Sequence, residues 1–356
     1  MKRYITFAMV MMICMVAVPV FAQAIQNVEV HGYMQNRLYF QESSSATIQS
    51  ERVSISALAK IAEVGNAYVE YYFMPAATGS GTYLESAYVD LEAGNGRVRV
   101  GKGRQLNFGM TPSYPNRKTT QYGIVAETFT QPRIVGAQYT NKLSAFDYGV
   151  TLYNDYRASS AQIGQSSGKT FTSFVSHVVN GDVPGSINKH LAVSGRFGIT
   201  KPCFSAHLSG SVGKFEQIDA NFIGAIYGMA AGANTDRDHN MYGADATYSF
   251  GPCVLQGEWY HGNFSFLGIT GWQVLAGYQP KDKTRFYARY STLNNDRSIV
   301  TVPTTNDLSR DTQQLTLGIV QPISKGIWVE TNYEHNTEYG SKVKDDLFFV
   351  ELFTGF

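Results

Sequence analysis

The stretch YGADATYSF, residues 242–250, decides the fold class because its side chains alternate between apolar and polar. Successive side chains of an extended strand point to opposite faces, so this segment has two chemically different faces. One face carries Tyr242, Ala244, Ala246, Tyr248 and Phe250, and the other carries Gly243, Asp245, Thr247 and Ser249. The second face is too polar for a packed protein core, so we expect it to contact water and the first face to contact lipid.

The same alternation recurs through the chain, in segments of roughly ten residues. Residues 203–212 and 284–291 repeat it clearly, with apolar side chains opposite Ser, His and Arg. Counting such segments gives about sixteen strands, although residues 171–179 would add a strand and the connection at residues 75–80 is short. A barrel of this size leaves an aqueous channel rather than a filled core.

The connections between these segments alternate in length. Turn-forming Gly, Pro, Asn, Asp and Lys residues mark short ones at 64–66, 94–96, 141–144, 201–202, 251–252, 281–283 and 324–326. Longer polar segments lie near 41–49, 105–132, 156–188, 215–238 and 294–310. We therefore predict an all-β fold, a transmembrane antiparallel β-barrel of about 16 strands with short periplasmic turns and long extracellular loops.

The first 24 residues are predicted to be a signal peptide. Lys2 and Arg3 form a basic start, residues 5–21 are apolar, and Ala22-Gln23-Ala24 is a small-residue cleavage site. No later stretch approaches the ~20 consecutive apolar residues of a membrane-spanning helix. Residues 25–356 are therefore expected to form one barrel domain in the bacterial outer membrane, in contact with outer-membrane lipids.

Composition and motifs exclude several other classes. The chain contains 34 Gly, 23 Tyr and 21 Phe with 16% charged residues, which suits a β-wall whose aromatic side chains face lipid. A net charge of +1 does not favour nucleic-acid binding. The seven His residues have no metal-ligand spacing, and no nucleophile-elbow or phosphate-loop motif is present. We expect no metal, no cofactor and no enzymatic activity.

Two cysteines remain after removal of the leader. Strand parity directs Cys203 inward and Cys253 toward lipid, with a strand between them. A disulfide needs converging Cβ atoms and Cα atoms within about 7 Å. We therefore predict two free thiols.

The carboxy-terminal decapeptide LFFVELFTGF, residues 347–356, resembles the β-signal of outer-membrane barrels. Apolar residues alternate along it and the chain ends on an aromatic residue: Phe348, Val350, Leu352 and Phe356. Thr354 departs from the apolar residue usual at its position. The resemblance implies that these residues form an assembly signal for the outer-membrane insertion machinery.

Two internal segments resemble bacterial porins. Residues 85–102, with ESAYVDL, GNG and RVRVGK, resemble the hairpin before the third porin loop, and residues 278–290 resemble a later hairpin. LNFGM, residues 106–110, is also similar to phosphate-selective porins, so the two subfamilies stay open. The resemblance implies sixteen antiparallel strands, a homotrimer, and a third loop, residues 105–132, folded into the lumen.

Charges on that loop are expected to set ion selectivity, because a hydrated ion meets them inside a low-dielectric wall. General porins usually carry acidic residues there, whereas this chain has Arg104, Arg117, Lys118 and Arg133 against Glu127. We therefore predict a mild anion preference.

Strand parity directs further charges into the lumen. The basic ones are Arg37, Arg52, Arg99, Arg196, Arg285 and Arg289, and the acidic ones are Glu70, Asp90, Asp147, Asp245, Glu258, Glu330, Glu334 and Glu351. The basic group leans to early strands and the acidic group to late ones, which favours a transverse field across the channel. The alternative is that these are ordinary lumen charges, many of them paired across the sheet.

The sequence thus predicts a water-filled channel for passive diffusion of small hydrophilic solutes and ions. The alternatives are a substrate-specific channel of the phosphate or sugar type, and a sheath around a partner protein such as a cytochrome. A barrel phospholipase would need Ser and His on the outer surface, whereas Ser205 and His207 share an inward face.

Overall fold

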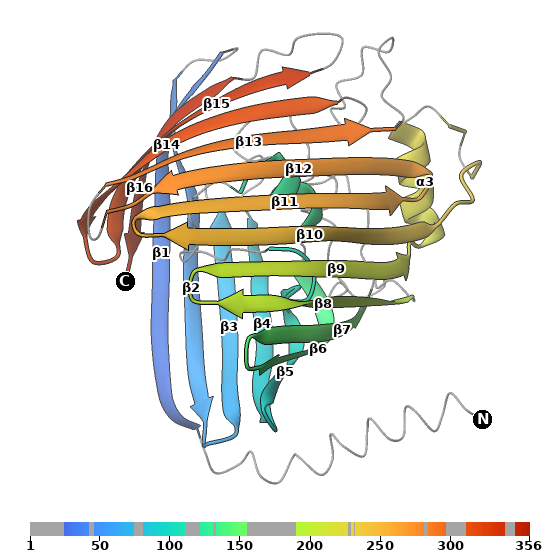
Figure 1. Ribbon diagram of the computed structural model, residues 1–356, viewed down its shortest axis with the longest axis horizontal. Helices are drawn as coiled ribbons and strands as arrows, with labels where there is room; N and C mark the ends of the chain where they lie inside the picture. Colours follow the sequence, from blue (N-terminus) through green and yellow to red (C-terminus); the bar gives the residue numbers. More distant parts are fainter. Residues whose placement is uncertain are drawn as a thin grey trace.

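A single closed antiparallel barrel accounts for most of the chain (Figure 1). The computed structural model describes residues 25–42, 46–74, 81–110, 122–130, 133–154, 190–226, 229–230, 232–280, 284–296, 311–338 and 346–356. Within these ranges sixteen strands pair with their neighbours in the chain, and β1 pairs with β16 to close the sheet. The predicted strand number and antiparallel topology are confirmed. The possible strand at 171–179, the connection at 75–80 and the proposed leader lie outside the described residues.

The strands follow in order, and the described parts of the connections contain two short helices. The strands are β1 (Ile25–Gln41), β2 (Thr47–Ile61), β3 (Gly65–Met74), β4 (Gly81–Ala93), β5 (Gly96–Arg104), β6 (Arg133–Leu143), β7 (Phe146–Asn154), β8 (Leu191–Lys201), β9 (Phe204–Lys214), β10 (Asp238–Phe250), β11 (Cys253–Phe264), β12 (Leu267–Tyr278), β13 (Arg285–Asn295), β14 (Thr312–Ser324), β15 (Ile327–Glu338) and β16 (Leu347–Gly355). The helices are α2 (Ile124–Phe129) and α3 (Gln217–Ile226). In the described part of the chain, no helix is both long and apolar enough to cross a membrane.

The period-two pattern of residues 242–250 becomes the two faces of β10. Tyr242, Tyr248 and Phe250 are exposed on the outside of the barrel, whereas Asp245 is buried on the inside. Trp259 and Trp272 are likewise exposed and lie directly opposite each other on β11 and β12. The outer surface is therefore an apolar and aromatic wall, as expected for strands that face hydrocarbon.

Tight turns occupy one end of the barrel, as the sequence predicts. Gly94, Gly251 and Gly326 have φ angles of 61°, 55° and 78°, the left-handed conformation that these short hairpins require. At the opposite end the connection between β11 and β12 is also short, residues 265–266, which departs from the expected alternation of lengths.

Both cysteines are free thiols in the structure. The inward orientation expected for Cys203 is wrong, because β9 begins at Phe204 and Cys203 lies exposed in the preceding turn. Cys253 is the first residue of β11 and is half-buried.

The chain terminus contributes to closure of the barrel. The backbone N–H of Gly32 donates to the carbonyl of Phe356, and the N–H of Phe356 donates to the carbonyl of Gly32, each at 2.9 Å. A Cβ atom on residue 32 would lie 2.5 Å from the ring of Phe356 and 2.7 Å from the backbone carbonyl oxygen of Ser54, so this close approach favours glycine. The ring itself stays exposed.

We expect Phe356→Ala to reduce insertion of the barrel while leaving its final closure intact, because the backbone hydrogen bonds do not depend on the ring. The measurement is the fraction of newly made protein that reaches the outer membrane in folded form. Phe250→Ala is the matched control, since Phe250 is another exposed aromatic at a strand end. Equal loss in both variants would contradict a specific assembly signal.

Candidate functional site

The connection between β5 and β6 folds into the barrel and follows its inner wall. Its first residues are held by hydrogen bonds to inward side chains of distant strands. Gln105 Nε2 donates to Ser194 Oγ at 2.7 Å, Gly109 N to Ser209 Oγ at 3.2 Å, and Met110 N to the Tyr260 hydroxyl at 2.9 Å. These contacts carry the loop from β8 past β9 to β11. The inward third loop is thus present in the described residues 105–110 and 122–130.

Asn107 anchors the first limb through three hydrogen bonds to the wall. Its Nδ2 donates to the carbonyls of Tyr139 and Val150 at 3.1 and 3.0 Å and lies 3.0 Å from the Thr151 hydroxyl. The space for the amide exists because residue 149 of β7 is glycine, and a Cβ there would overlap the Asn107 side chain. Asn107 is 3% exposed, so its amide is satisfied by the wall rather than by water.

The second limb contains α2 and packs through apolar side chains. Ile124, Val125 and Phe129 are buried in one cluster with the inward residues Tyr260 and Phe264. The Phe129 and Tyr260 rings lie 5.6 Å apart, and Phe108 of the first limb lies 5.7 Å from the same tyrosine. Burial of apolar area therefore adds to the polar contacts of the first limb.

Two consecutive residues of the loop contact opposite walls of the barrel. The hydroxyl of Tyr122 accepts a hydrogen bond from Arg104 Nη2 of β5 at 3.0 Å. Gly123 lies against Arg289 of β13, and a Cβ there would be 2.5 Å from the guanidinium Nε. In the closed order of sixteen described strands, β5 and β13 are eight positions apart. The loop therefore spans the lumen at this level.

The predicted basic residues lie along the inner wall, and most contact a partner. Arg37 of β1 pairs with Glu351 of β16, and Arg99 pairs with Asp90 through contacts of 2.8 Å. Arg133 pairs with Glu85, which also interacts electrostatically with Arg104 and Arg52. Arg52 lies 4.6 Å from the Tyr72 ring centroid, Arg285 interacts with Glu330, and Arg289 donates to Thr316 at 2.9 Å. Arg117, Lys118 and the side chain of Glu127 lie outside the described residues.

The expected separation of early basic and late acidic strands does not persist in space. Closure makes β1 and β16 neighbours, so Arg37 lies directly opposite Glu351. Asp90 and Arg99 are likewise cross-strand partners on β4 and β5. These pairs follow the alternative of local neutralisation across the sheet.

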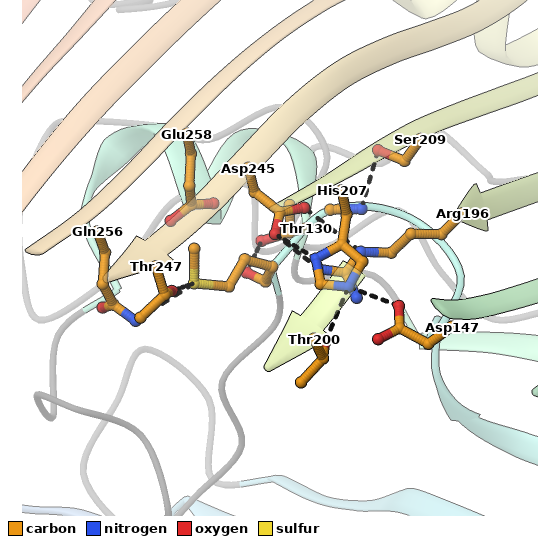
Figure 2. A network of polar contacts seen from close by, with 12 residues as sticks. Thr130, Asp147, Arg196, Thr200, His207, Ser209, Asp245, Thr247, Gln256 and Glu258 are labelled. Atoms are coloured by element: carbon orange, nitrogen blue, oxygen red, sulfur yellow. Dashed lines mark hydrogen bonds and ion pairs between the residues drawn. The ribbon is translucent and has the colours of Figure 1, made fainter. Parts of the chain in front are cut away.

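A further polar network surrounds His207 of β9, beside the anchored loop (Figure 2). Nε2 of His207 lies 2.6 Å from Asp147 Oδ1, and Nδ1 lies 3.3 Å from Asp245 Oδ1. Arg196 Nη2 donates to the same Asp245 oxygen at 2.6 Å. The His207 ring thus bridges two carboxylates, and Arg196 places a positive charge beside them. The network holds β7, β8, β9 and β10 together beneath Ser209, the anchor of Gly109.

Sequence reasoning placed the charges on the correct face but missed the anchors. Asn107, Ser209 and Tyr260 anchor the loop through contacts with residues that are 32 to 150 positions away. From the sequence, strand parity indicates only that Ser209 and Tyr260 point inward. It does not identify the residues that they contact. Among the described residues, no group of three His, Cys, Asp or Glu side chains is placed to hold a metal ion.

Comparisons with known proteins identify relatives of this barrel. A sequence model of the family described as Gram-negative porin matches residues 8–341. The fold is similar to OmpF of Salmonella typhi in a daunomycin complex, with a TM-score of 0.66 and 13% identity over 92% of this chain and 97% of that chain. The trimer form of OmpT, an outer membrane protein of Vibrio cholerae, has a TM-score of 0.59 and 14% identity over 93% and 99%.

The anion-selective porin from Comamonas acidovorans has a TM-score of 0.57 and 13% identity over 93% of this chain and 99% of that chain. At identities this low, the TM-scores establish a shared fold and nothing more specific. No curated protein matches the sequence.

Proposed function

Because the chain belongs to the Gram-negative porin family, we propose that it is a general diffusion pore whose third loop sets the width of the channel. The protein is an outer-membrane channel for solute diffusion. The proposal adds that its solutes are small and hydrophilic, that flux needs no chemistry, and that no cofactor takes part. It also adds a homotrimer, which the trimer form of OmpT from Vibrio cholerae supports. Residues 1–24 are proposed to be removed as a leader.

One observation carries the proposed role of the loop. Tyr122 and Gly123 contact Arg104 and Arg289 on opposite walls, so solutes must pass beside this crossing segment. Ions passing there meet Arg104 at short range, where the low-dielectric wall strengthens the influence of its charge. Arg99, Arg285 and Arg289, with Arg37, Arg52 and Arg133, are proposed to line the passage on either side of this level.

We also propose a mild anion preference. Most of the inner-wall arginines described above lie close to carboxylates. Additional cations on the loop therefore make the net charge of the passage more positive. Arg52, Arg104 and Arg133 gather around Glu85, and Glu70 also interacts with Glu85 and Arg133, which gives three cations and two anions. Arg117 and Lys118 add positive charge on the same loop, opposed there by Glu127.

We expect Arg117→Gln combined with Lys118→Gln to move the reversal potential in a salt gradient toward the value of a cation-selective pore. The physical reason is the loss of two positive charges from the loop whose described residues cross the lumen. The measurement is the zero-current potential of purified protein in a planar bilayer under a tenfold KCl gradient.

Lys142→Gln is the matched control, since Lys142 lies next to the tight turn that follows β6 rather than on the loop. An unchanged potential in the double variant would reject the proposed selectivity. Arg104→Gln should shift the potential in the same direction, because Arg104 contacts Tyr122 at the crossing.

The other candidate functions make different experimental predictions. A substrate-specific channel would show conductance that saturates or is blocked at millimolar solute. A sheath would co-purify with a haem protein, although the anchored loop and α2 occupy lumen space that such a partner would need. A lipid hydrolase should release fatty acid from vesicles, yet His207 faces inward between two carboxylates. We expect neither co-purification nor hydrolysis.

A further inference from the structure

The outer wall carries an apolar groove that the channel function does not use. It has a volume of about 720 Å³ and crosses the outside of the barrel from β10 and β11 to β16. None of the described residues that line it is charged. Its volume falls in the range of roughly 300–1,000 Å³ that is typical of sites for small ligands.

The shape of the groove follows from one cross-strand row of outward residues. Strand pairing places in line Leu255, Ala276, Ala288, Leu317, Tyr333 and Phe348. The two adjacent alanines form a depression, because their side chains are shorter than those of every other residue in the row. The next row toward the tight turns contains Tyr278, Phe286 and Ile319, which are large and exposed and form one rim.

The dimensions suit a long and narrow occupant. Six strands at a spacing of about 4.8 Å give the row a length of roughly 24 Å. A groove of this length, one side chain wide, matches an extended hydrocarbon chain. The wall of a second barrel is several strands broad, so it would rest on the rims and leave the alanine floor empty.

The position of the groove indicates where the occupant comes from. The protein lies in the outer membrane, and the groove opens on the outward face of membrane-crossing strands. Its lower end includes Phe250, Cys253 and Tyr278, which adjoin the tight turn at 251–252 and the end of β12. Tight turns lie on the periplasmic side of such barrels. A lipid of the periplasmic leaflet therefore has direct access.

We propose that this groove binds an acyl chain of a phospholipid from the periplasmic leaflet, seated on the floor formed by Ala276 and Ala288. The site lies outside the lumen and is separate from the constriction. Its recognition is by shape and apolar contact, with Tyr278 and Phe286 as the rim.

The test is to fill the floor with Ala288→Phe. Protein reconstituted in phosphatidylethanolamine vesicles is extracted into mild detergent, and native mass spectrometry measures phospholipid retained per chain and the oligomeric state. We expect the wild type to retain phospholipid and Ala288→Phe to lose most of it. Channel conductance should be unchanged, because Ala288 lies on the outward row with Ala276 and Leu317.

The matched control is Ala244→Phe, an outward alanine on β10 that pairs with Leu208 and Trp259 outside the groove. It should retain phospholipid as the wild type does. Ala276→Leu gives a second test of the floor should Ala288→Phe fail to fold. The proposal is overturned if the wild type retains no phospholipid, or if floor variants and control retain it equally. Dissociation of the oligomer by floor variants with lipid unchanged would identify a second copy as the occupant and also overturn it.

Discussion

Channels carrying Asn107→Ala are expected to conduct more current, with larger fluctuations, than the wild type. The substitution removes the amide that bonds the first limb of the loop to Tyr139, Val150 and Thr151. Losing such buried hydrogen bonds costs about 2 kcal/mol, which raises the population of the released loop roughly 30-fold. Single-channel recording in planar bilayers gives both the mean conductance and the noise.

A second variant tests the same anchor from the wall. Gly149→Ala places a methyl group where the Asn107 amide lies, so it should release the loop without changing the loop sequence. Gly195→Ala is the control, because a Cβ at that glycine of β8 has room, with the Gly149 carbonyl oxygen 3.6 Å away. Wild-type conductance and noise in both Asn107→Ala and Gly149→Ala would show that this anchor does not hold the constriction.

Removal of Arg37 is expected to lower the thermal stability of the barrel more than removal of Glu351. Glu351 is fully buried and lies directly opposite both Arg37 and Glu330 on its two neighbouring strands. Arg37→Leu therefore leaves two buried carboxylates facing each other, whereas Glu351→Gln leaves Arg37 beside Glu51 at 3.7 Å. Breaking a buried pair costs about 3–5 kcal/mol, and like charges directly opposite add to the loss.

The measurement is the temperature at which the folded band disappears on semi-native gel electrophoresis. Arg37→Leu combined with Glu351→Gln completes a double-mutant cycle with the two single variants and should recover part of the stability lost in Arg37→Leu. The exposed Lys214 and Asp238, 3.9 Å apart, provide a control pair, and replacing either residue should have little effect on the melting temperature. If the two single variants and the double variant of Arg37 and Glu351 all had the same melting temperature as the wild type, the two residues would not be energetically coupled.

Only part of the candidate site was accessible from sequence. Parity placed Arg37, Arg99 and Arg289 on the inner face, because side-chain direction in a strand depends only on position along that strand. The resemblance to porins implied that the loop at residues 105–132 folds into the lumen, and counting strands placed that loop after the fifth strand. The contacts of Tyr122 and Gly123 did not, since nothing local to them indicates that β5 and β13 lie opposite each other.

The amino-acid sequence by itself determined the fold class, the antiparallel strands, the lipid-facing aromatic wall and the polar inner face. These properties repeat every two residues and every hairpin, so a local pattern is sufficient to specify them. Tertiary structure alone decided that Arg37 meets Glu351, that Asn107 bonds to two strands of the wall, and that Ala276 and Ala288 form one floor. Each of these depends on register between strands and on closure of the sheet, which join residues that lie far apart in the chain.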